Sequence, residues 1–313
     1  MDTAAAHARP ASGLNRGYLI AIIGTLIWST TAIFIRYLTE TYRIPPLVLA
    51  FWRDSFAALA LAGAFLAVTP TRLRVSRKHL GFLAGYGLVL AVFNSLWTVS
   101  VALNGAAVST VLAYSSAAFT AVLGWWFFHE RLYPAKVVAV LLSLAGSAFV
   151  SGAYLPAAWG VNTLGILTGL LSGIGLSGYS LMGRASAQRS IDPWTALLYT
   201  FSFAAVFILA FNFIPTWPLG LNPAPNLAWL GNAWMGWLVL VLLAVGPTIG
   251  GYGLFTVSLT YLPASAANLI ATLEPPMTAL LAYLLLAERF SSPQMFGSAL
   301  VIVGLIILRL FES

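Results

Sequence analysis

Long apolar stretches alternate with short polar connections along the whole chain. A membrane-spanning helix needs about 17 to 25 mostly apolar residues, which is about the length of each stretch. The stretches together leave almost no chain for a separate soluble domain. We therefore predict an all-α integral membrane protein with ten transmembrane helices. The expected spans cover residues 17–38, 46–69, 80–102, 106–128, 135–152, 163–183, 194–214, 235–260, 264–286 and 294–310.

Composition supports this interpretation. Hydrophobic residues make up 60% of the chain and charged residues 7%, and the mean hydropathy is +0.91. A water-soluble domain carries roughly 25% charged residues, so a soluble globular protein is excluded. The chain has no cysteine, which excludes a disulfide framework and a thiolate metal site. Residues 1–16 are small and polar and show no cleavage site after a short apolar run, so we expect a cytoplasmic tail and not a signal peptide.

The positive charges are unevenly distributed, which sets the expected orientation, because basic residues favour the cytoplasmic side of a membrane. The predicted cytoplasmic cations are Arg9, Arg16, Arg72, Arg74, Arg77, Lys78, Arg131, Lys136, Arg184, Arg189 and Arg309, against Arg36, Arg43 and Arg289 on the other side. We therefore expect a bacterial-type inner-membrane protein with both termini in the cytoplasm. Since these cations lie in short loops beside spans, the net charge of +7 does not indicate a nucleic-acid partner.

Two halves of the chain carry similar residues at a fixed spacing. Leu-Trp-Thr-Val-Ser at 96–100 returns as Leu-Phe-Thr-Val-Ser at 254–258, and Glu130-Arg131 returns as Glu288-Arg289, both 158 positions later (254 minus 96, 288 minus 130). We therefore expect residues 17–152 and 163–310 to form two similar five-helix repeats, with chance similarity between apolar stretches as the alternative. An odd number of spans inverts the second repeat in the membrane. Inverted repeats around a central cavity are typical of transporters.

Three further motifs carry a resemblance to a known family. They are Phe128-His-Glu-Arg131 with its counterpart Leu286-Ala-Glu-Arg289, Glu274-Pro275-Pro276 within the ninth span, and Arg53 within the second. From about residue 17 to 310 the chain resembles the drug/metabolite transporter superfamily, specifically the ten-helix EamA-type exporters and their aromatic amino-acid branch. The resemblance implies a multi-pass exporter whose central cavity is lined by both halves. Ser116 stands where the second half has Glu274, so the first half departs from the pattern.

Three charged side chains inside the spans, Glu274, Arg53 and Asp54, are candidates for a functional or structural role. An unpaired charged carboxylate there costs about 2.5 to 3.5 kcal/mol, so Glu274 is neutral, paired or solvated. It could exchange a proton or bind a substrate ammonium, or it could cap backbone freed by the prolines or pair with Arg53. If Asn268 and Thr272 face the cavity, a turn of 100° per residue directs Glu274 toward neighbouring helices. Arg53 could extend to the outer surface, pair with Glu274 or meet a substrate carboxylate, and its neighbour Asp54 is expected to have a separate partner.

The predicted solute site is uncharged and is repeated in both halves. Aromatic walls with a few hydrogen-bonding groups suit a small, partly apolar solute, although such rings can also face lipid or pack between helices. The predicted lining consists of Asn94, Trp97, Thr110 and Tyr114, their counterparts Tyr252, Phe255, Asn268 and Thr272, and also Trp28 and Tyr179.

Glycines are frequent in the sixth span (Gly165, Gly169, Gly173, Gly175, Gly178) and in the eighth (Gly246, Gly250, Gly251, Gly253). Small residues let helix backbones approach closely, so we predict that these two helices meet at the centre of the bundle. Such a contact would allow either hinge motion or simple close packing.

Together with the family resemblance, which implies export and includes amino-acid exporters, these patterns predict an exporter of small amphiphilic metabolites that works by alternating access. Aromatic or large neutral amino acids are the first choice of solute. Purine-like bases, drugs and a lipid-linked sugar are the alternatives within transporters, and an intramembrane enzyme or a receptor in other classes. The sequence shows no HExxH pattern and no Ser/His or paired-Asp set inside the spans, so we expect no enzyme. We expect no metal and no cofactor. The expected partners are the solute and the lipid bilayer, and the sequence does not distinguish a monomer from a homodimer.

Overall fold

The computed structural model describes residues 11–159, 163–213, 226–286 and 291–311, and these residues form helices and short connections with no β-strand. Residues 1–10 of the expected tail, and Glu288 and Arg289 of the repeated dipeptide, lie outside the described residues. The helices are α1 (Ala11–Ser29), α2 (Thr31–Tyr42), α3 (Pro46–Val68), η1 (Pro70–Leu73), α4 (Arg77–Tyr114), α5 (Ser116–Phe128), α6 (Pro134–Ser151), η2 (Pro156–Trp159), α7 (Thr163–Gln188), α8 (Pro193–Asn212), α9 (Trp234–Leu243), the π-helical η3 (Ala244–Tyr252), α10 (Gly253–Tyr261), α11 (Ala264–Ala271), α12 (Glu274–Leu286) and α13 (Ser292–Phe311).

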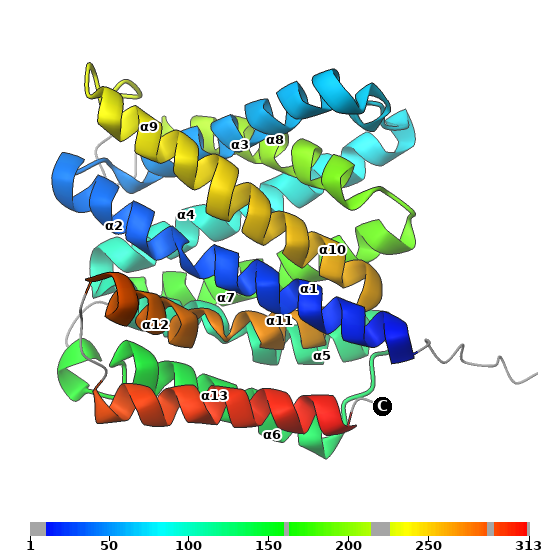
Figure 1. Cartoon of the computed structure of the whole chain (residues 1–313), viewed down its shortest axis with the longest axis vertical. Helices are drawn as coiled ribbons and strands as arrows, with labels where there is room; N and C mark the ends of the chain where they lie inside the picture. The colour runs from blue at the N-terminus through cyan, green and yellow to red at the C-terminus, as the bar shows by residue number, and fades with distance from the viewer. Residues whose placement is uncertain (1–10, 160–162, 214–225, 287–290, 312–313) are drawn as a thin grey trace, which may run out of the picture.

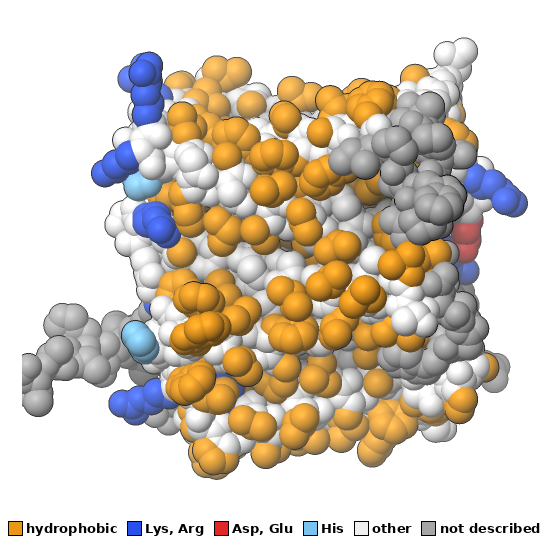
Figure 2. Space-filling view, turned by 180° about the vertical axis from the view of Figure 1, so that it is seen from behind, with side chains coloured by type: hydrophobic (Ala, Val, Ile, Leu, Met, Phe, Trp, Pro, Cys, Tyr) orange, Lys and Arg blue, Asp and Glu red, His pale blue; other side chains and the backbone are white. Residues whose placement is uncertain are grey.

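The fold is an all-α membrane fold, as predicted. Within the described ranges, nine helical segments are long and apolar enough to cross a membrane. The remaining expected span, the ninth at 264–286, is helical as well but is divided into α11 and α12. Figure 2 shows an apolar surface across the middle of the molecule, with Lys and Arg side chains gathered mostly along one edge. This distribution is typical of a membrane protein whose apolar middle surface contacts lipid and whose charged ends contact water.

Helix α4 contains a reversal of the chain. In a straight helix, residues nine positions apart are separated by about 13 Å along the axis. The hydroxyl of Ser100 nevertheless donates a hydrogen bond to the hydroxyl of Ser109 at 2.8 Å. The chain therefore turns back between these two residues, and α4 supplies parts of two spans, Arg77–Val101 and Val108–Phe128.

The first spans of the two halves run in opposite directions. Helix α1 begins and α13 ends at the same side of the molecule, which we call the terminal face (Figure 1). Near this face Gly17 of α1 lies against Leu262, and Arg184 Nη1 near the end of α7 donates to the carbonyl of Leu259 at 2.8 Å. At the other end of α1, the Trp28 ring contacts the Tyr252 ring at a tilt of 48°. Helix α1 thus runs away from the terminal face and α7 runs toward it, so the second half is inverted relative to the first.

Corresponding spans of the two halves also pack against each other in antiparallel fashion. The end of α8 meets the start of α3, where Asn212 Nδ2 donates to the Leu47 carbonyl at 3.2 Å, and the start of α8 meets η1, where the Tyr199 hydroxyl donates to the Leu73 carbonyl at 2.8 Å. Helices α6 and α13 cross at Gly146 and Gly297, where a Cβ on either glycine would lie 2.5 Å from the carbonyl oxygen of the other. Only glycine permits this approach.

The glycines of the sixth and eighth spans pack against other helices and not against each other. Gly169 and Gly173 of α7 face Leu112 of the α4 segment that follows the reversal. In η3, Gly251 lies against Trp28 of α1.

The two helices do meet inside the bundle, as predicted, since the Tyr179 ring of α7 lies 5.5 Å from the Tyr252 ring and 6.3 Å from the Phe255 ring. The contact is made by these aromatic side chains and not by the predicted glycines, which accommodate side chains from other neighbours.

Candidate functional site

A cavity of about 70 Å³ lies between the two halves and is lined by side chains of both. Six of the ten predicted site residues line it: Trp28, Asn94, Trp97, Thr110, Tyr114 and Tyr252. The charged side chains Arg53 and Glu274 line it as well. The remaining lining residues were not predicted: Thr31, Ile35, Phe93, Ala113, Leu176 and Ala271. Most of these are small or aliphatic, and nothing in the sequence distinguishes them from residues that face lipid.

Four predicted site residues are absent from the lining: Tyr179, Phe255, Asn268 and Thr272. Helices α7 and α10 run toward the terminal face, so Tyr179 and Phe255 lie one turn beyond the lining residues Leu176 and Tyr252. Both side chains are fully buried, with ring centroids 6.3 Å apart, and Tyr86 packs on Tyr179 at 4.9 Å. These rings fill the bundle between the cavity and the terminal face.

Asn268 forms hydrogen bonds that connect three spans between the cavity and the terminal face. Its Oδ1 accepts from the Ser116 hydroxyl at 2.9 Å, and its Nδ2 donates to the Ser180 hydroxyl at 2.8 Å. The Ser177 hydroxyl donates to the Ser116 carbonyl at 3.0 Å. The amide thus has the partners that a polar group in a membrane bundle needs. Thr272 is also buried, and its hydroxyl donates to the Leu269 carbonyl of its own helix.

The aromatic wall depends on an unusual helical segment. Residues 244–252 are π-helical around Pro247, which cannot donate a backbone hydrogen bond. The hydroxyl of Thr248 instead donates to the carbonyl of Leu243 at 2.8 Å. The segment ends at Tyr252, whose ring centroid lies 4.4 Å from that of Trp28. Single π-helical turns are frequent at functional sites, and here the turn positions one ring of the cavity.

Arg53 and Asp54 pair with each other. Arg53 Nε lies 3.0 Å from Asp54 Oδ1, and Asp54 Oδ2 accepts from Asn94 Nδ2 at 3.2 Å. Arg53 is 6% exposed and does not extend to the outer surface. The expectation that these neighbours need separate partners is wrong, because the long arginine side chain folds back along the helix to reach the adjacent carboxylate.

Glu274 faces the cavity and accepts a hydrogen bond from the Tyr114 hydroxyl. The ninth span is interrupted at Thr272–Leu273, and α12 begins at Glu274, with Pro275 and Pro276 in the first turn, where a proline costs no helical hydrogen bond. The expectation that Glu274 faces neighbouring helices depended on Asn268 and Thr272 facing the cavity. Those two residues do not line the cavity, whereas Glu274 does, so the condition is not met.

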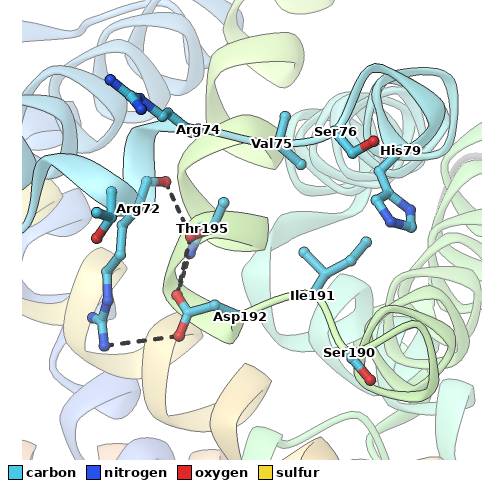
Figure 3. Close-up of a pocket in the computed structure, with 10 residues that line it drawn as sticks. Arg72, Arg74, Val75, Ser76, His79, Ser190, Ile191, Asp192 and Thr195 are labelled. Atoms are coloured by element: carbon cyan, nitrogen blue, oxygen red, sulfur yellow. Dashed lines mark hydrogen bonds and ion pairs between the residues drawn. The ribbon is translucent and has the colours of Figure 1, made fainter.

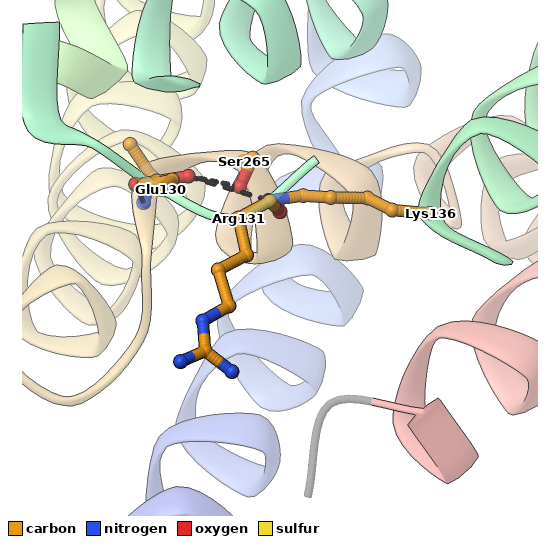
Figure 4. A network of polar contacts seen from close by, with 5 residues as sticks. Glu130, Arg131, Lys136 and Ser265 are labelled. Carbon is orange, nitrogen blue, oxygen red and sulfur yellow. Dashed lines mark hydrogen bonds and ion pairs between the residues drawn. The ribbon is translucent and has the colours of Figure 1, made fainter. Parts of the chain in front are cut away.

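A polar network lies at the terminal face (Figure 4). Glu130, which follows α5 in the first half, accepts hydrogen bonds from the backbone N–H of Ala264 at 2.9 Å and from the hydroxyl of Ser265. Lys136 Nζ lies 3.4 Å from Glu130 Oε2, and both side chains are almost completely buried. Glu130 therefore holds the N-terminus of α11, which belongs to the other half, and a carboxylate at this end of a helix is favoured.

A larger hollow of about 330 Å³ lies on the surface of the terminal face, between η1, the start of α4 and the α7–α8 connection (Figure 3). Asp192 caps α8 by accepting from the Thr195 N–H at 2.9 Å, and Arg72 Nη2 approaches Asp192 at 3.8 Å. Both charged side chains are about 40% exposed, so their pairing contributes little stability. This hollow is a polar surface of connecting segments and does not lie between the spans. Among the described residues, no group of three His, Cys, Asp or Glu side chains could hold a metal ion.

Comparison with known proteins places this architecture in a family. Residues 15–152 and 163–310 each match the EamA-like transporter family. The chain is 26% identical to the uncharacterized transporter YwfM of Bacillus subtilis (strain 168), over 93% of this chain and 92% of that protein. It is 25% identical to the probable amino-acid metabolite efflux pump of Escherichia coli (strain K12), over 92% of this chain and 93% of that protein. A solved crystal structure with 22% sequence identity has the same fold, with a TM-score of 0.73 over 95% of this chain and 98% of that one. The chain therefore belongs to the EamA-like transporter family and is a multi-pass membrane transporter.

Proposed function

We propose that this transporter exports small amphiphilic metabolites, aromatic or large neutral amino acids first of all, by alternating access between its two halves. The observation that carries the proposal is the cavity between the halves, where the rings of Trp28, Trp97 and Tyr252 stand beside the polar groups of Asn94 and Thr110. Rings provide contact area for an apolar side chain, and a few polar groups orient the solute. The relative named as an amino-acid metabolite efflux pump supports this class of solute.

The volume of the cavity implies movement. Pockets for small solutes usually measure about 300 to 1,000 Å³, whereas this cavity measures about 70 Å³. A large neutral amino acid therefore enters only when the two halves move apart on one side. The layer of Tyr86, Tyr179 and Phe255 and the hydrogen bonds of Glu130 support a state that is closed toward the terminal face. Rocking of inverted repeats exchanges such a state for one that is closed on the opposite face.

The distribution of charge supports an orientation with the terminal face in the cytoplasm. Cations of that face include Arg72, Arg74, Arg77 and Lys78, which precede or begin α4. Under the positive-inside rule both termini are then cytoplasmic, and we place the protein in a bacterial inner membrane. One relative, from Salmonella typhimurium, is named an inner membrane transporter. Export carries the solute from the terminal face to the opposite face. The family consists of transporters, and we propose no enzymatic activity.

Counterflow in proteoliposomes tests the proposed function. Vesicles containing the purified protein are loaded with an unlabelled solute, and uptake of the same labelled solute is followed for a panel of amino acids and purine bases. We expect accumulation for tryptophan, phenylalanine or leucine, and a loss of at least tenfold in the Trp97→Ala variant. Accumulation of purines without any amino acid would favour the base-exporting alternative. Binding without accumulation of any solute would contradict a transporter and favour a receptor or an enzyme.

A further inference from the structure

Arg53 presents an unsatisfied donor at the cavity wall. Its side chain belongs to α3 of the first half, is 6% exposed and lines the cavity. Its Nη2 is buried and has no hydrogen-bond partner among the described residues. Buried donors in folded proteins are almost always paired, and a charged donor is the most costly to leave unpaired. The missing partner is therefore expected to be an acceptor on a molecule that enters the cavity.

The other side of the guanidinium is held in place. Arg53 Nε donates to Asp54 Oδ1, and the second oxygen of Asp54 accepts from Asn94. Asp54 is fully buried and has both oxygens engaged, so it fixes the orientation of Arg53. A guanidinium anchored through Nε keeps its terminal N–H groups for another ligand. The planar N–H fork matches the two oxygens of a carboxylate.

Glu274 supplies the opposite charge from the second half. It lines the same cavity, and the Tyr114 hydroxyl donates to it, which leaves acceptor capacity on the carboxylate. Among the described residues, the ion pair of Arg53 is with Asp54 and not with Glu274. Two oppositely charged side chains that share a cavity without contacting each other fit a solute that carries both charges. The solute carboxylate would give Nη2 of Arg53 its acceptor, and the solute ammonium would give Glu274 a cation.

We propose that the cavity recognises the zwitterionic head group of an α-amino acid. The solute carboxylate binds the terminal N–H groups of Arg53, and the solute ammonium binds Glu274. This inference rests on the proposed function and adds the chemical groups that the solute must carry. The rings of Trp28 and Tyr252 lie on the same cavity and contact the solute side chain. Because Arg53 and Glu274 belong to different halves, a zwitterion connects the two repeats. A solute without the carboxylate leaves the Nη2 donor of Arg53 without an acceptor, and a solute without the ammonium leaves Glu274 without a cation.

Three indole solutes distinguish the contact of the solute carboxylate with Arg53 from the contact of the solute ammonium with Glu274. L-Tryptophan carries both charges, tryptamine only the ammonium, and 3-indolepropionate only the carboxylate. Equilibrium binding of each labelled solute is measured by scintillation proximity on purified wild-type protein, Arg53→Gln and Glu274→Gln. Each contact is a charged hydrogen-bonded pair, so its loss weakens binding about tenfold or more. Arg53→Gln should weaken the binding of tryptophan and 3-indolepropionate but not that of tryptamine. Glu274→Gln should weaken the binding of tryptophan and tryptamine but not that of 3-indolepropionate.

Two controls accompany these variants. Arg36→Gln makes the same change in an exposed ion pair with Glu40 on α2 and should leave binding of all three solutes unchanged. Arg53→Gln alone leaves the buried Asp54 carboxylate without its cation, which can prevent folding. The double variant Arg53→Gln/Asp54→Asn removes both charges and carries the comparison in that case. Wild-type protein adds an independent readout, because it should bind tryptophan at least tenfold more tightly than either single-charge analogue.

The outcomes separate this inference from the proposed function. If the variants bind all three solutes more weakly to an equal extent, or bind them as tightly as wild-type protein does, Arg53 and Glu274 have structural roles. Either result would overturn the zwitterion assignment. Equal binding of the three solutes by wild-type protein would overturn it as well. Normal counterflow of tryptophan in those cases would leave the proposed export of amino acids intact. Absence of both tryptophan binding and amino-acid counterflow in wild-type protein would contradict the proposed function itself.

Discussion

The contacts of Glu130 allow a quantitative prediction about opening at the terminal face (Figure 4). Opening requires α11 of the second half to separate from the end of α5 of the first half. Two hydrogen bonds to Glu130 cross this boundary, from the backbone N–H of Ala264 at 2.9 Å and from the hydroxyl of Ser265. Lys136 belongs to the same half as Glu130, so their ion pair at 3.4 Å can persist when the halves separate.

The variant Glu130→Gln keeps the shape of the side chain and removes its charge. Hydrogen bonds to a charged group contribute about 1.5 to 3 kcal/mol each, and neutral ones about 0.5 to 1.5 kcal/mol. The closed state therefore loses about 1 kcal/mol at each of the two contacts, or about 2 kcal/mol in total. Since about 1.4 kcal/mol corresponds to a factor of ten, the population open at the terminal face should rise roughly 30-fold.

Cysteine labelling measures this population directly. The natural chain contains no cysteine, so one introduced at the cavity residue Ala113 gives a single site. A membrane-impermeant maleimide is added at the terminal face of oriented vesicles that contain Ala113→Cys, with and without Glu130→Gln. We expect labelling to accelerate up to about 30-fold, the factor derived above for the population. Glu40→Gln, the same change in an exposed pair within α2, should have no effect. An unchanged or slower rate with Glu130→Gln would refute the reasoning.

Three further predictions concern packing, pH and the aromatic wall. Gly297→Ala places a Cβ 2.5 Å from the Gly146 carbonyl oxygen, so we expect the purified protein to lose about 1 to 3 kcal/mol of stability and several degrees in thermal unfolding. Gly81→Ala, where no atom lies within 4 Å of the new Cβ, should not lower the melting temperature, because alanine favours a helix more than glycine does. Equal melting of both variants would contradict the close crossing. A proton competes with the solute ammonium for the Glu274 carboxylate, so acidification should weaken tryptophan binding in wild-type protein but not in Glu274→Gln. An identical pH profile of binding in both proteins would mean that this carboxylate does not bind the ammonium. Trp28→Ala should reduce tryptophan binding about tenfold and alanine binding much less, measured by the same assay, because it removes apolar contact and no charge.

The fold could be predicted from sequence because its main determinants recur along the chain. The length of each apolar run predicts a span, and the repeated Leu-Trp-Thr-Val-Ser and Glu-Arg patterns predict two similar halves. Inversion then follows from an odd number of spans in each half. The helices are interrupted at matching positions, at Ser115 in the first half and at Thr272–Leu273 in the second. The interruption in the first half could not be predicted, because no proline or charged residue marks its position.

The candidate site was predictable in part. Asn94 and Thr110 are polar groups in apolar helices and line the cavity, whereas Asn268 has its hydrogen-bond partners inside the bundle. Glu274 was expected to face away from the cavity only if Asn268 and Thr272 faced it, and they do not. Helical periodicity gives the relative directions of residues but not which face of the helix borders the cavity. Tyr179 and Phe255 could not be separated from Tyr252 by type or spacing, since the depth of a ring along the bundle depends on how far each helix extends. The pairing of Arg53 with its neighbour depends on side-chain conformation, which sequence spacing does not specify.

Blocking the cavity tests most directly whether solute passes between the two inverted halves. Counterflow of labelled tryptophan is measured in proteoliposomes that contain Ala113→Cys, before and after complete reaction with a bulky maleimide. Ala113 is 5% exposed and lines the cavity, so the adduct fills a space of about 70 Å³. We expect tryptophan to accumulate before modification and not after it. Undiminished counterflow through fully modified protein would contradict a path through this cavity.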